Sequence, residues 1–247
     1  MIHDPLFKVD LLSYTPNPNR VMYAALHTDY SEDYIADTWE QTLDSLSEEK
    51  AGGIVVKRLL EGNRGHWGCI EHVGFVFAAG YFPHSMMQQL RTHRVGVSFD
   101  VQSFRYSGHR IIDVADGKRS VDDVFYLRPV GRYADRQGDP YEYTQERREH
   151  HKQRCLEAAK QYKEDVEIYG LSEEHARGLI PFDTRQHFVV STNARSFFHI
   201  MDLRWKKDAQ GEIQAFCDLA FPLVQNVLPE ISDWYLKNRA KKALLAP

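Results

Sequence analysis

The segment from Gln88 to Arg110 concentrates side chains that could bind a phosphate or a flat ring. Between serine, phenylalanine and tyrosine residues it carries Arg91, His93, Arg94, Arg105 and Arg110. A guanidinium group is a planar fork of donors that matches phosphate oxygens, and it also stacks on aromatic rings. On a helix, Gln88, Arg91 and Arg94 would follow one another at intervals of one turn and could face a ligand together. The alternative is a solvated basic helix end, which the helix dipole favours.

A second polar segment runs from His66 to His72 and places two histidines and Glu71 around a Trp-Gly turn. Such residues can bind a metal, but zinc ligands on helices usually have a tighter spacing, such as His-x-x-x-His. Histidines at a turn also donate hydrogen bonds to backbone carbonyls. The spacing therefore favours a structural turn, and we expect no metal centre.

The third segment contains Arg185, Asn193, Arg195, His199 and Arg204, with Arg177 a little upstream. On a helix that begins after Asn193, Arg195 and His199 are four residues apart and share one face. The amino-terminal end of a helix also attracts anions. The alternative is a set of ordinary surface arginines, so this segment alone indicates an anion site only modestly.

The sequence lacks the glycine-rich motifs that usually bind nucleotide phosphates. No Gly-x-Gly-x-x-Gly follows a predicted strand, and no Gly-x-x-x-x-Gly-Lys-Ser/Thr occurs, so a phosphate must be held by side chains. Cys69, Cys155 and Cys217 form no Cys-x-x-Cys pair, which indicates a reducing cytoplasm rather than a disulfide framework. Only Cys69 has a possible activating neighbour, His72, and a small buried apolar role is more common.

The elements that must position these segments alternate between strands and helices. A helix is predicted over residues 45–62, opened by a capping box from Ser45 to Glu48. Alternating apolar residues predict a strand over 71–81, and a helix should begin at Pro83 and end near Arg94. A loop should follow over 95–108, then strands over 110–116 and 123–130, and a turn-rich interval over 133–143.

The carboxy-terminal half is predicted to be mainly helical. The longest helix ends at Gly170 and carries one apolar stripe, formed by Cys155, Ala159, Tyr162, Val166 and Tyr169. Ser172 should cap the next helix, residues 184–192 should form a strand, and Asn193 should cap a helix over 193–204. The last helix should kink or break at Pro222. With no repeat or long linker, we expect one α+β domain over residues 1–247.

Composition restricts the possible partners. The chain is 43% apolar and 12% aromatic, with a formal net charge of -4, so it can bury a core and has no overall charge that calls for nucleic acid or an anionic membrane. No basic and then apolar leader opens the sequence, and no window approaches about 18 apolar residues. We therefore expect a cytoplasmic protein without a membrane or nucleic-acid partner.

Taken together, the motifs resemble those of the flavin-dependent thymidylate synthases, whose signature is Arg-His-Arg, then a serine, then Ser-x-Arg. Here the pattern stands as Arg91-Thr92-His93-Arg94, Ser98 and Ser103-Phe104-Arg105, with an extra residue placed at Thr92. Residues 66–72 are similar to the family's histidine-containing turn, and residues 191–204 to its Asn-Ala-Arg-Ser helix. Residues 24–31 are similar to a weaker stretch, so that the resemblance spans most of residues 20–205.

The resemblance implies a central, mostly antiparallel sheet flanked by helices, and a homotetramer with shared active sites. It implies FAD contacts from Thr28, His66, Glu71, Arg91, His93, Arg94, Asn193, Arg195 and His199. It implies deoxyuridylate (dUMP) contacts from Gln88, Ser103, Arg105, Arg177 and Arg204. Of these, Arg204 would stabilise charge on the pyrimidine, Arg105 and Arg177 would bind the phosphate, and Ser103 would hydrogen-bond the nucleotide.

The implied reaction makes thymidylate from dUMP. Methylenetetrahydrofolate would supply the carbon, NADPH would reduce the flavin, and no cysteine nucleophile would be needed. Two alternatives remain at this point. The arginine and aromatic residues of 88–110 could bind single-stranded nucleic acid, or His66, His72 and His93 could serve a metal-dependent hydrolase.

Overall fold

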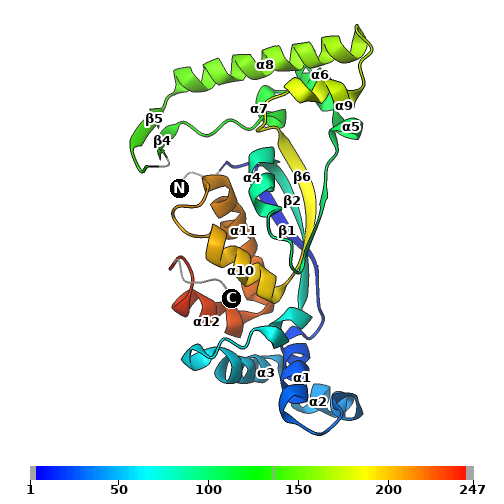
Figure 1. The fold of residues 1–247 in the computed structure, drawn as a ribbon, viewed down its shortest axis with the longest axis vertical. Helices are drawn as coiled ribbons and strands as arrows, with labels where there is room; N and C mark the ends of the chain where they lie inside the picture. The colour runs from blue at the N-terminus through cyan, green and yellow to red at the C-terminus, as the bar shows by residue number, and fades with distance from the viewer. Residues whose placement is uncertain (1–3, 136, 243–247) are drawn as a thin grey trace. The chain divides into compact units, whose positions relative to one another are not determined.

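The computed structural model describes residues 4–135 and 137–242. In these residues, a four-stranded sheet has the order β1-β2-β6-β3, and a separate two-stranded hairpin pairs β4 with β5 (Figure 1). The strands are β1 (Lys8–Tyr14), β2 (Gly74–Pro83), β3 (Val97–Val101), β4 (Gly131–Ala134), β5 (Pro140–Tyr143) and β6 (Arg185–Asn193).

Hydrogen bonds at the two ends of β2 and β6 give their relative direction. The Ala194 amide donates to the Val73 carbonyl at 2.7 Å, and the His84 amide donates to the Thr184 carbonyl at 3.0 Å. Residue numbers therefore rise along β2 as they fall along β6, which is the antiparallel arrangement. The predicted mixed class, with a mostly antiparallel sheet and flanking helices, is confirmed.

Backbone contacts group the described residues into two compact units. The first unit comprises residues 4–7, 79–89 and 100–188, and the second comprises residues 8–78, 90–99 and 189–242. The chain passes from one unit to the other within β2, β3 and β6. The expectation of one domain over residues 1–247 stays a prediction.

The first unit is built on its longest helix. Its helical elements are α4 (His84–Leu90, whose last residue belongs to the second unit), α5 (Phe104–Ser107), α6 (His109–Ala115), α7 (Val121–Val124), α8 (Gln145–Glu167), α9 (Glu173–Ala176) and the 3-10 turn η5 (Arg177–Leu179). The predicted stripe on α8 is largely confirmed, because Cys155, Ala159 and Tyr162 are buried against Ile111 and Val114 of α6. Tyr169 lies beyond the helix end and is exposed.

A buried arginine anchors the start of β6 in the first unit. Arg185 is 2% exposed and forms an ion pair with Asp4 at 2.7 Å. Its Nε and Nη1 donate to the carbonyls of Asp122 and Tyr81 at 2.7 and 2.9 Å. Because a buried charge is costly unless it is paired and fully hydrogen-bonded, this network marks Arg185 as structural.

The second unit holds most of the helices. They are α1 (Pro18–Tyr30), η1 (Ile35–Thr38), α2 (Trp39–Ser45), α3 (Glu48–Val55), the π-helical η2 (Val56–Leu60), η3 (Glu61–Asn63), η4 (Gly68–His72), α10 (Ala194–Arg204), α11 (Gly211–Val227) and α12 (Pro229–Asn238). Helix α10 packs on η4 and α11. Its Phe197 ring lies 6.0 and 5.9 Å from the rings of Phe75 and Phe77 on β2, which forms an aromatic core.

Three local predictions for helices are corrected. Ser45 ends α2, and the cap of α3 is Ser47, whose hydroxyl accepts a hydrogen bond from the Lys50 amide at 3.2 Å. Residues 110–116 form most of helix α6 instead of a strand, because short apolar runs do not distinguish the two. Helix α11 does not break at Pro222 and ends at Val227, since its buried apolar face outweighs the lost hydrogen bond, while the kink expected as the other outcome stays a prediction.

Two segments predicted to be irregular contain strands. The expected loop over 95–108 holds β3 and the short helix α5, and the turn-rich interval forms the β4–β5 hairpin. In the hairpin, Tyr133 pairs with Tyr141 across the strands, and their rings stack with centroids 6.0 Å apart. Cross-strand aromatic contacts of this kind stabilise short strands that carry a weak sequence signal.

Candidate functional site

Helix α10 begins where β6 ends, and Asn193 makes the junction. The Asn193 side chain accepts a hydrogen bond from the Ser196 amide at 2.8 Å, which confirms the predicted cap. Ala194, the first residue of the helix, is fully buried. The helix therefore presents Arg195 and His199 from a rigid start, with its positive dipole end at the same place.

The segment after α4 approaches this helix start closely at Gly96. Gly96 has a φ of +64°, and its carbonyl accepts from the Asn193 amide at 3.0 Å. A Cβ atom here would lie 2.3 Å from Asn193 Nδ2 and 2.6 Å from Ser196 Oγ. Only glycine combines this backbone conformation with this contact. The adjacent Val95 carbonyl accepts a hydrogen bond from the Ser196 hydroxyl at 2.7 Å.

Between these two segments lies a cavity of about 410 Å³ that is lined by charged and polar side chains from three elements. Its walls are formed by Glu71, Thr92, His93, Arg94, Val95, Val97, Arg195, Ser196 and His199. Segments that lie about one hundred residues apart in the sequence therefore meet here. All of them belong to the second unit.

A second cavity of about 760 Å³ shares Arg94 and Val97 with the first. It is also lined by Ser98, by Asn193 and by residues of β1, β2 and β6 near the strand ends. Arg94 is exposed, so its guanidinium is accessible from both cavities. An elongated ligand that occupied both cavities would therefore meet the Arg94 cation between them.

Arg204, at the last turn of α10, binds back to the Arg-Thr-His-Arg segment. Its Nε donates to Nε2 of His93 at 3.0 Å, and its Nη2 donates to the Thr92 hydroxyl at 3.1 Å. Because arginine only donates, His93 Nε2 must be unprotonated, and the ring hydrogen of neutral His93 lies on Nδ1. The His93 and His199 rings meet edge to face, with centroids 5.5 Å apart.

The pKa of His93 is lowered from 6.5 to about 4. Burial of the ring is the main cause, and the positive charge of Arg204 and the neighbouring His199 act in the same direction. Only 7% of His93 is exposed. At neutral pH this residue is therefore an uncharged hydrogen-bonding group that orients Arg204.

Glu71, on η4, forms an ion pair with Arg195 across the first cavity. Both side chains are partly exposed, at 43% and 39%, so water screens the pair and its contribution to stability is small. The pair instead orients the Arg195 guanidinium through its Nη1 atom and leaves the other donors available to an anion.

Three of the expected flavin contacts line neither cavity. Thr28 lies on the last turn of α1 and donates its hydroxyl to the Ala24 carbonyl. His66 is exposed, with its backbone amide bound to the Leu59 carbonyl. Arg91 follows α4 and is also exposed. Their roles in cofactor binding stay predictions.

The expected nucleotide contacts other than Arg204 lie in the first unit. Ser103 caps α5 and accepts a hydrogen bond from the Arg105 amide. Arg105 pairs with Glu174 of α9 at 3.1 Å, and Arg177 follows directly after α9. The first unit therefore brings Arg105 and Arg177 into one neighbourhood, although they are 72 residues apart in the sequence. Gln88, on α4, binds His84 at 2.7 Å.

The sequence reasoning did not identify three residues that shape the site. The Thr92 hydroxyl accepts a hydrogen bond from Arg204, and the Ser196 hydroxyl donates one to the Val95 carbonyl. Gly96 permits the close approach of its segment to α10. Glycine between two valines in a predicted loop was the one signal that could have identified Gly96, because such a position often needs a positive φ.

Over residues 4–135 and 137–242, no three His, Cys, Asp or Glu side chains are grouped so as to hold a metal ion. Nor does this part of the chain contain a helix that is long and apolar enough to span a membrane.

The family model for the thymidylate synthase complementing protein matches residues 10–230. The chain belongs to this family. The resemblance found in the motifs is therefore confirmed.

Relatives in the family align over nearly the whole chain. A flavin-dependent thymidylate synthase from Haloarcula marismortui is 32% identical over 251 residues, covering 97% of this chain and 99% of its own. One from Nitratidesulfovibrio vulgaris is 29% identical over 224 residues, covering 91% of this chain and 84% of its own.

Two solved structures share the fold. The UMP/dUMP methylase PolB from Streptomyces cacaoi, bound with 5-Br dUMP, superposes with a TM-score of 0.71 at 20% identity and covers 98% of this chain and 97% of its own. ThyX from Helicobacter pylori, with FAD and dUMP, gives 0.63 at 17% identity and covers 87% of this chain and 92% of its own.

Proposed function

We propose that this protein is a flavin-dependent thymidylate synthase, which methylates dUMP to dTMP and uses FAD as its cofactor. The observation that carries the proposal is the meeting of the Arg-Thr-His-Arg segment with the Asn-Ala-Arg-Ser helix around one cavity. Family membership and relatives of this name along the whole chain support the same activity.

The hydrogen-bond donors that line these two neighbouring cavities fit FAD. Arg94 and Arg195 offer guanidinium forks for a pyrophosphate, and the amino-terminal end of α10 adds its dipole. At Gly96 the absence of a Cβ lets the backbone pack directly against the Asn193 and Ser196 side chains at the start of α10. We assign FAD binding to Thr28, His66, Glu71, Arg91, His93, Arg94, Asn193, Arg195 and His199. When bound, FAD supplies the hydride that completes the methyl group.

Nucleotide binding is assigned to Gln88, Ser103, Arg105, Arg177 and Arg204. Arg105 and Arg177 are neighbours in the first unit and suit the phosphate. Arg204, oriented by neutral His93 and by Thr92, stabilises negative charge on the pyrimidine. Ser103 already serves as a helix cap and hydrogen-bonds the nucleotide without attacking it.

No cysteine acts as a nucleophile in this proposal. Burial raises the pKa of the Cys69 and Cys155 thiols to about 11 and also raises the pKa of Cys217. At neutral pH these sulfurs are therefore protonated, whereas a nucleophile has to be a thiolate. This supports a reaction without a cysteine nucleophile. In the proposed reaction methylenetetrahydrofolate supplies the carbon and NADPH supplies the reducing electrons through the cofactor.

The remaining parts of the proposal concern assembly and location. We propose a homotetramer whose active sites combine residues of more than one chain, working in the cytoplasm without nucleic-acid or membrane partners. The formal net charge of -4 gives no general attraction to anionic polymers.

An absorption spectrum of the purified protein in the near-ultraviolet and visible range tests the cofactor. We expect flavin bands that bleach when NADPH is added under anaerobic conditions in the presence of dUMP. We expect dTMP to form once methylenetetrahydrofolate is also supplied. A colourless protein that takes up no added FAD would refute the proposal. A colourless protein that binds an oligonucleotide with a steep salt dependence would favour nucleic-acid binding instead.

A further inference from the structure

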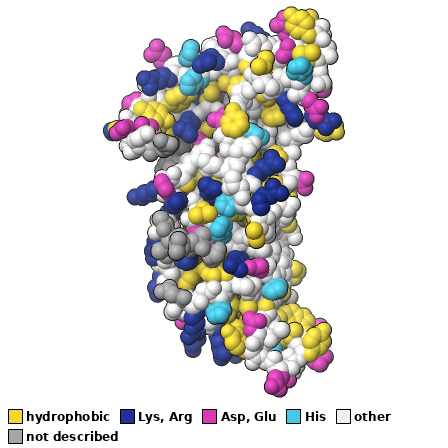
Figure 2. All heavy atoms as spheres, viewed as in Figure 1, with side chains coloured by type: hydrophobic (Ala, Val, Ile, Leu, Met, Phe, Trp, Pro, Cys, Tyr) yellow, Lys and Arg dark blue, Asp and Glu magenta, His cyan; other side chains and the backbone are white. Residues whose placement is uncertain are grey.

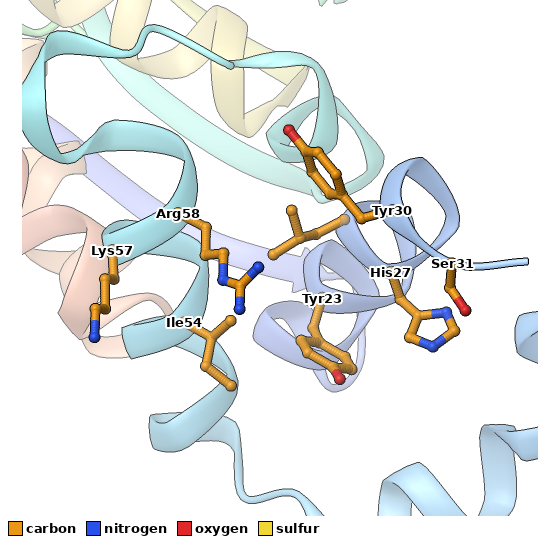
Figure 3. A pocket seen from close by; sticks show the side chains of 8 residues that line it. Tyr23, His27, Tyr30, Ser31, Ile54, Lys57 and Arg58 are labelled. Atoms are coloured by element: carbon orange, nitrogen blue, oxygen red, sulfur yellow. The ribbon is translucent and has the colours of Figure 1, made fainter.

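The second unit contains another cavity, which shares no lining residue with the two described above. It lies between α1 and the segment formed by α3 and η2, and its volume is about 350 Å³. It is lined by Tyr23, Leu26, His27, Tyr30, Ser31, Ile54, Lys57 and Arg58 (Figure 3).

One face of α1 forms the aromatic wall of this cavity. Tyr23, His27 and Tyr30 are four and three residues apart and therefore project from the same side of the helix. Thr28, an expected flavin contact, lies about 140° around the helix from Tyr23 at 3.6 residues per turn. The cavity thus faces a different direction from the residue of α1 that we assign to FAD.

The opposite wall carries two cations on an unusual backbone. Helix α3 changes at Val56 into the π-helix η2, which carries Lys57 and Arg58. Such segments are rare and often occur at functional sites. Both side chains are exposed, and neither makes an ion pair or a side-chain hydrogen bond with any described residue. Figure 3 shows the Arg58 guanidinium pointing toward the space between Tyr23 and Tyr30.

His27 lies in the aromatic wall formed by α1. His27 Nδ1 is inaccessible to solvent and has no hydrogen-bond partner among the described residues. Its ring centroid lies 6.2 Å from that of Tyr23. Because this nitrogen has almost no accessible surface, His27 contributes its ring to the wall and not a polar contact for a ligand.

The chemistry of these groups selects the ligand. The Arg58 guanidinium has no ion pair among the described residues and can bind two oxygens of a phosphate monoester, which carries a charge of about -1.5 to -2 at pH 7. Figure 3 shows the Lys57 side chain pointing away from Arg58, so Lys57 adds only longer-range attraction. Tyrosine rings offer stacking surfaces for a base. A volume near the lower end of the usual range of about 300–1,000 Å³ suits a mononucleotide rather than a dinucleotide. We propose that this cavity binds a nucleoside monophosphate at a site separate from the flavin cavities.

Equilibrium dialysis with labelled AMP tests the site, with excess FAD present so that adenine does not enter the flavin cavities. We expect one AMP to bind per chain, and adenosine or inorganic phosphate to bind at least about tenfold more weakly, because each supplies only one half of the contacts. Arg58→Gln should weaken AMP binding by about tenfold, since it removes a charge-assisted hydrogen bond. Arg58 is exposed, so this variant should fold.

Lys160→Gln is the matched control. Lys160 is an exposed lysine of α8 without an ion pair among the described residues, so its loss changes the net charge equally and should leave AMP affinity unchanged. The proposal is overturned if no AMP binds in excess FAD, if Arg58→Gln binds AMP as well as the wild type, or if inorganic phosphate binds as tightly as AMP. None of these results depends on thymidylate synthesis, which is measured separately.

Discussion

At the scale of single residues, the site depends on the neutral state of His93 and on the orientation of Arg204, and each supports the other. His93 accepts a hydrogen bond from Arg204 only while it is neutral, and its burial keeps it neutral. Arg204 in turn gains a fixed direction from His93 and Thr92. A positively charged His93 would lose this bond and repel Arg204.

The shifted pKa of His93 predicts a loss of stability in acid. The unfolded chain protonates this ring near pH 6.5 and the folded chain near pH 4, so the unfolded state binds more protons in between. The free energy of unfolding should therefore fall as the pH decreases through this window, by at most about 1.4 kcal/mol per pH unit from this residue. Urea unfolding at several pH values measures the slope.

His93→Asn supplies the comparison for that slope, because asparagine does not titrate. The variant should show a shallower dependence of stability on pH between about 4 and 6.5. An unchanged slope would mean that His93 is not the group responsible.

Gly96 should not tolerate a side chain. Gly96→Ala forces a positive φ on alanine, which costs about 1–2 kcal/mol, and sets a Cβ against Asn193 and Ser196. The displaced Asn193 can no longer cap α10 well, so FAD affinity should fall together with the free energy of unfolding. Flavin titration and urea unfolding of the same variant measure both effects.

Gly117→Ala is the control for Gly96. Gly117 has a φ of +72°, but a Cβ there would meet nothing within 4 Å. It should therefore show the conformational cost alone and keep its FAD affinity. Equal losses of affinity in both variants would contradict the role assigned to Gly96.

At the scale of elements, a buried hydrogen-bond network connects α10 to α12 and to Arg239, which follows it. Asp202 is 5% exposed and accepts hydrogen bonds from the Tyr235 hydroxyl at 3.0 Å and from Arg239 at 2.7 Å. Burial raises the pKa of Asp202, although Arg239 and Tyr235 oppose this. Since α10 also carries Arg195 and Arg204, this buried network fixes the helix that serves the site.

Tyr235→Phe should therefore lower both the free energy of unfolding and the affinity for FAD. It leaves a buried carboxylate oxygen without one partner, which costs about 1–3 kcal/mol in the free energy of unfolding. FAD affinity should fall as α10 loses its fixed position. Thermal unfolding with and without FAD gives both quantities.

Tyr162→Phe is the matched control on α8. The Tyr162 hydroxyl is buried and has no hydrogen-bond partner in the part of the chain that the structure describes, so its removal should change stability little. If Tyr162→Phe and Tyr235→Phe lower the free energy of unfolding equally, the Asp202 network does not contribute the stability assigned to it.

At the scale of the whole molecule, charge is mixed rather than concentrated. Figure 2 shows basic, acidic and histidine side chains interspersed on the face that it draws, in agreement with a formal net charge of -4. Anion binding must therefore come from local groups, such as Arg94 and Arg195, and not from a general positive field.

The three cysteines are distributed over both units and are all buried. Since their thiols are protonated at neutral pH, separate substitutions of Cys69, Cys155 and Cys217 by alanine should each leave thymidylate synthesis within a few-fold of the wild type. Assays of dTMP formation at saturating FAD measure this. If one variant bound FAD and dUMP normally and lost turnover, the reaction without a cysteine nucleophile would be wrong.

The sequence by itself determined the family, the mixed helix–sheet class and the positions of the main site segments. These rest on local signals, such as the Asn193 cap, the alternation along β2 and the spacing of the arginines, which act over a few residues and need no distant partner. Short segments were predicted less well. Residues 110–116 take their helical form from packing against α8, which local propensity does not record, and the β4–β5 hairpin depends on ring contacts across its own strands, which single short strands do not signal.

Only the tertiary structure decided how the site residues meet. The contacts of Arg204 with His93 and Thr92, the approach of Gly96 to Asn193, and the burial that lowers the pKa of His93 all join residues that are about one hundred positions apart. The cavity between α1 and η2 likewise joins two separate segments, residues 23–31 and 54–58, and the second of them includes the start of a π-helix. Burial and close approach depend on the whole packed unit, so no local pattern in the sequence encodes them.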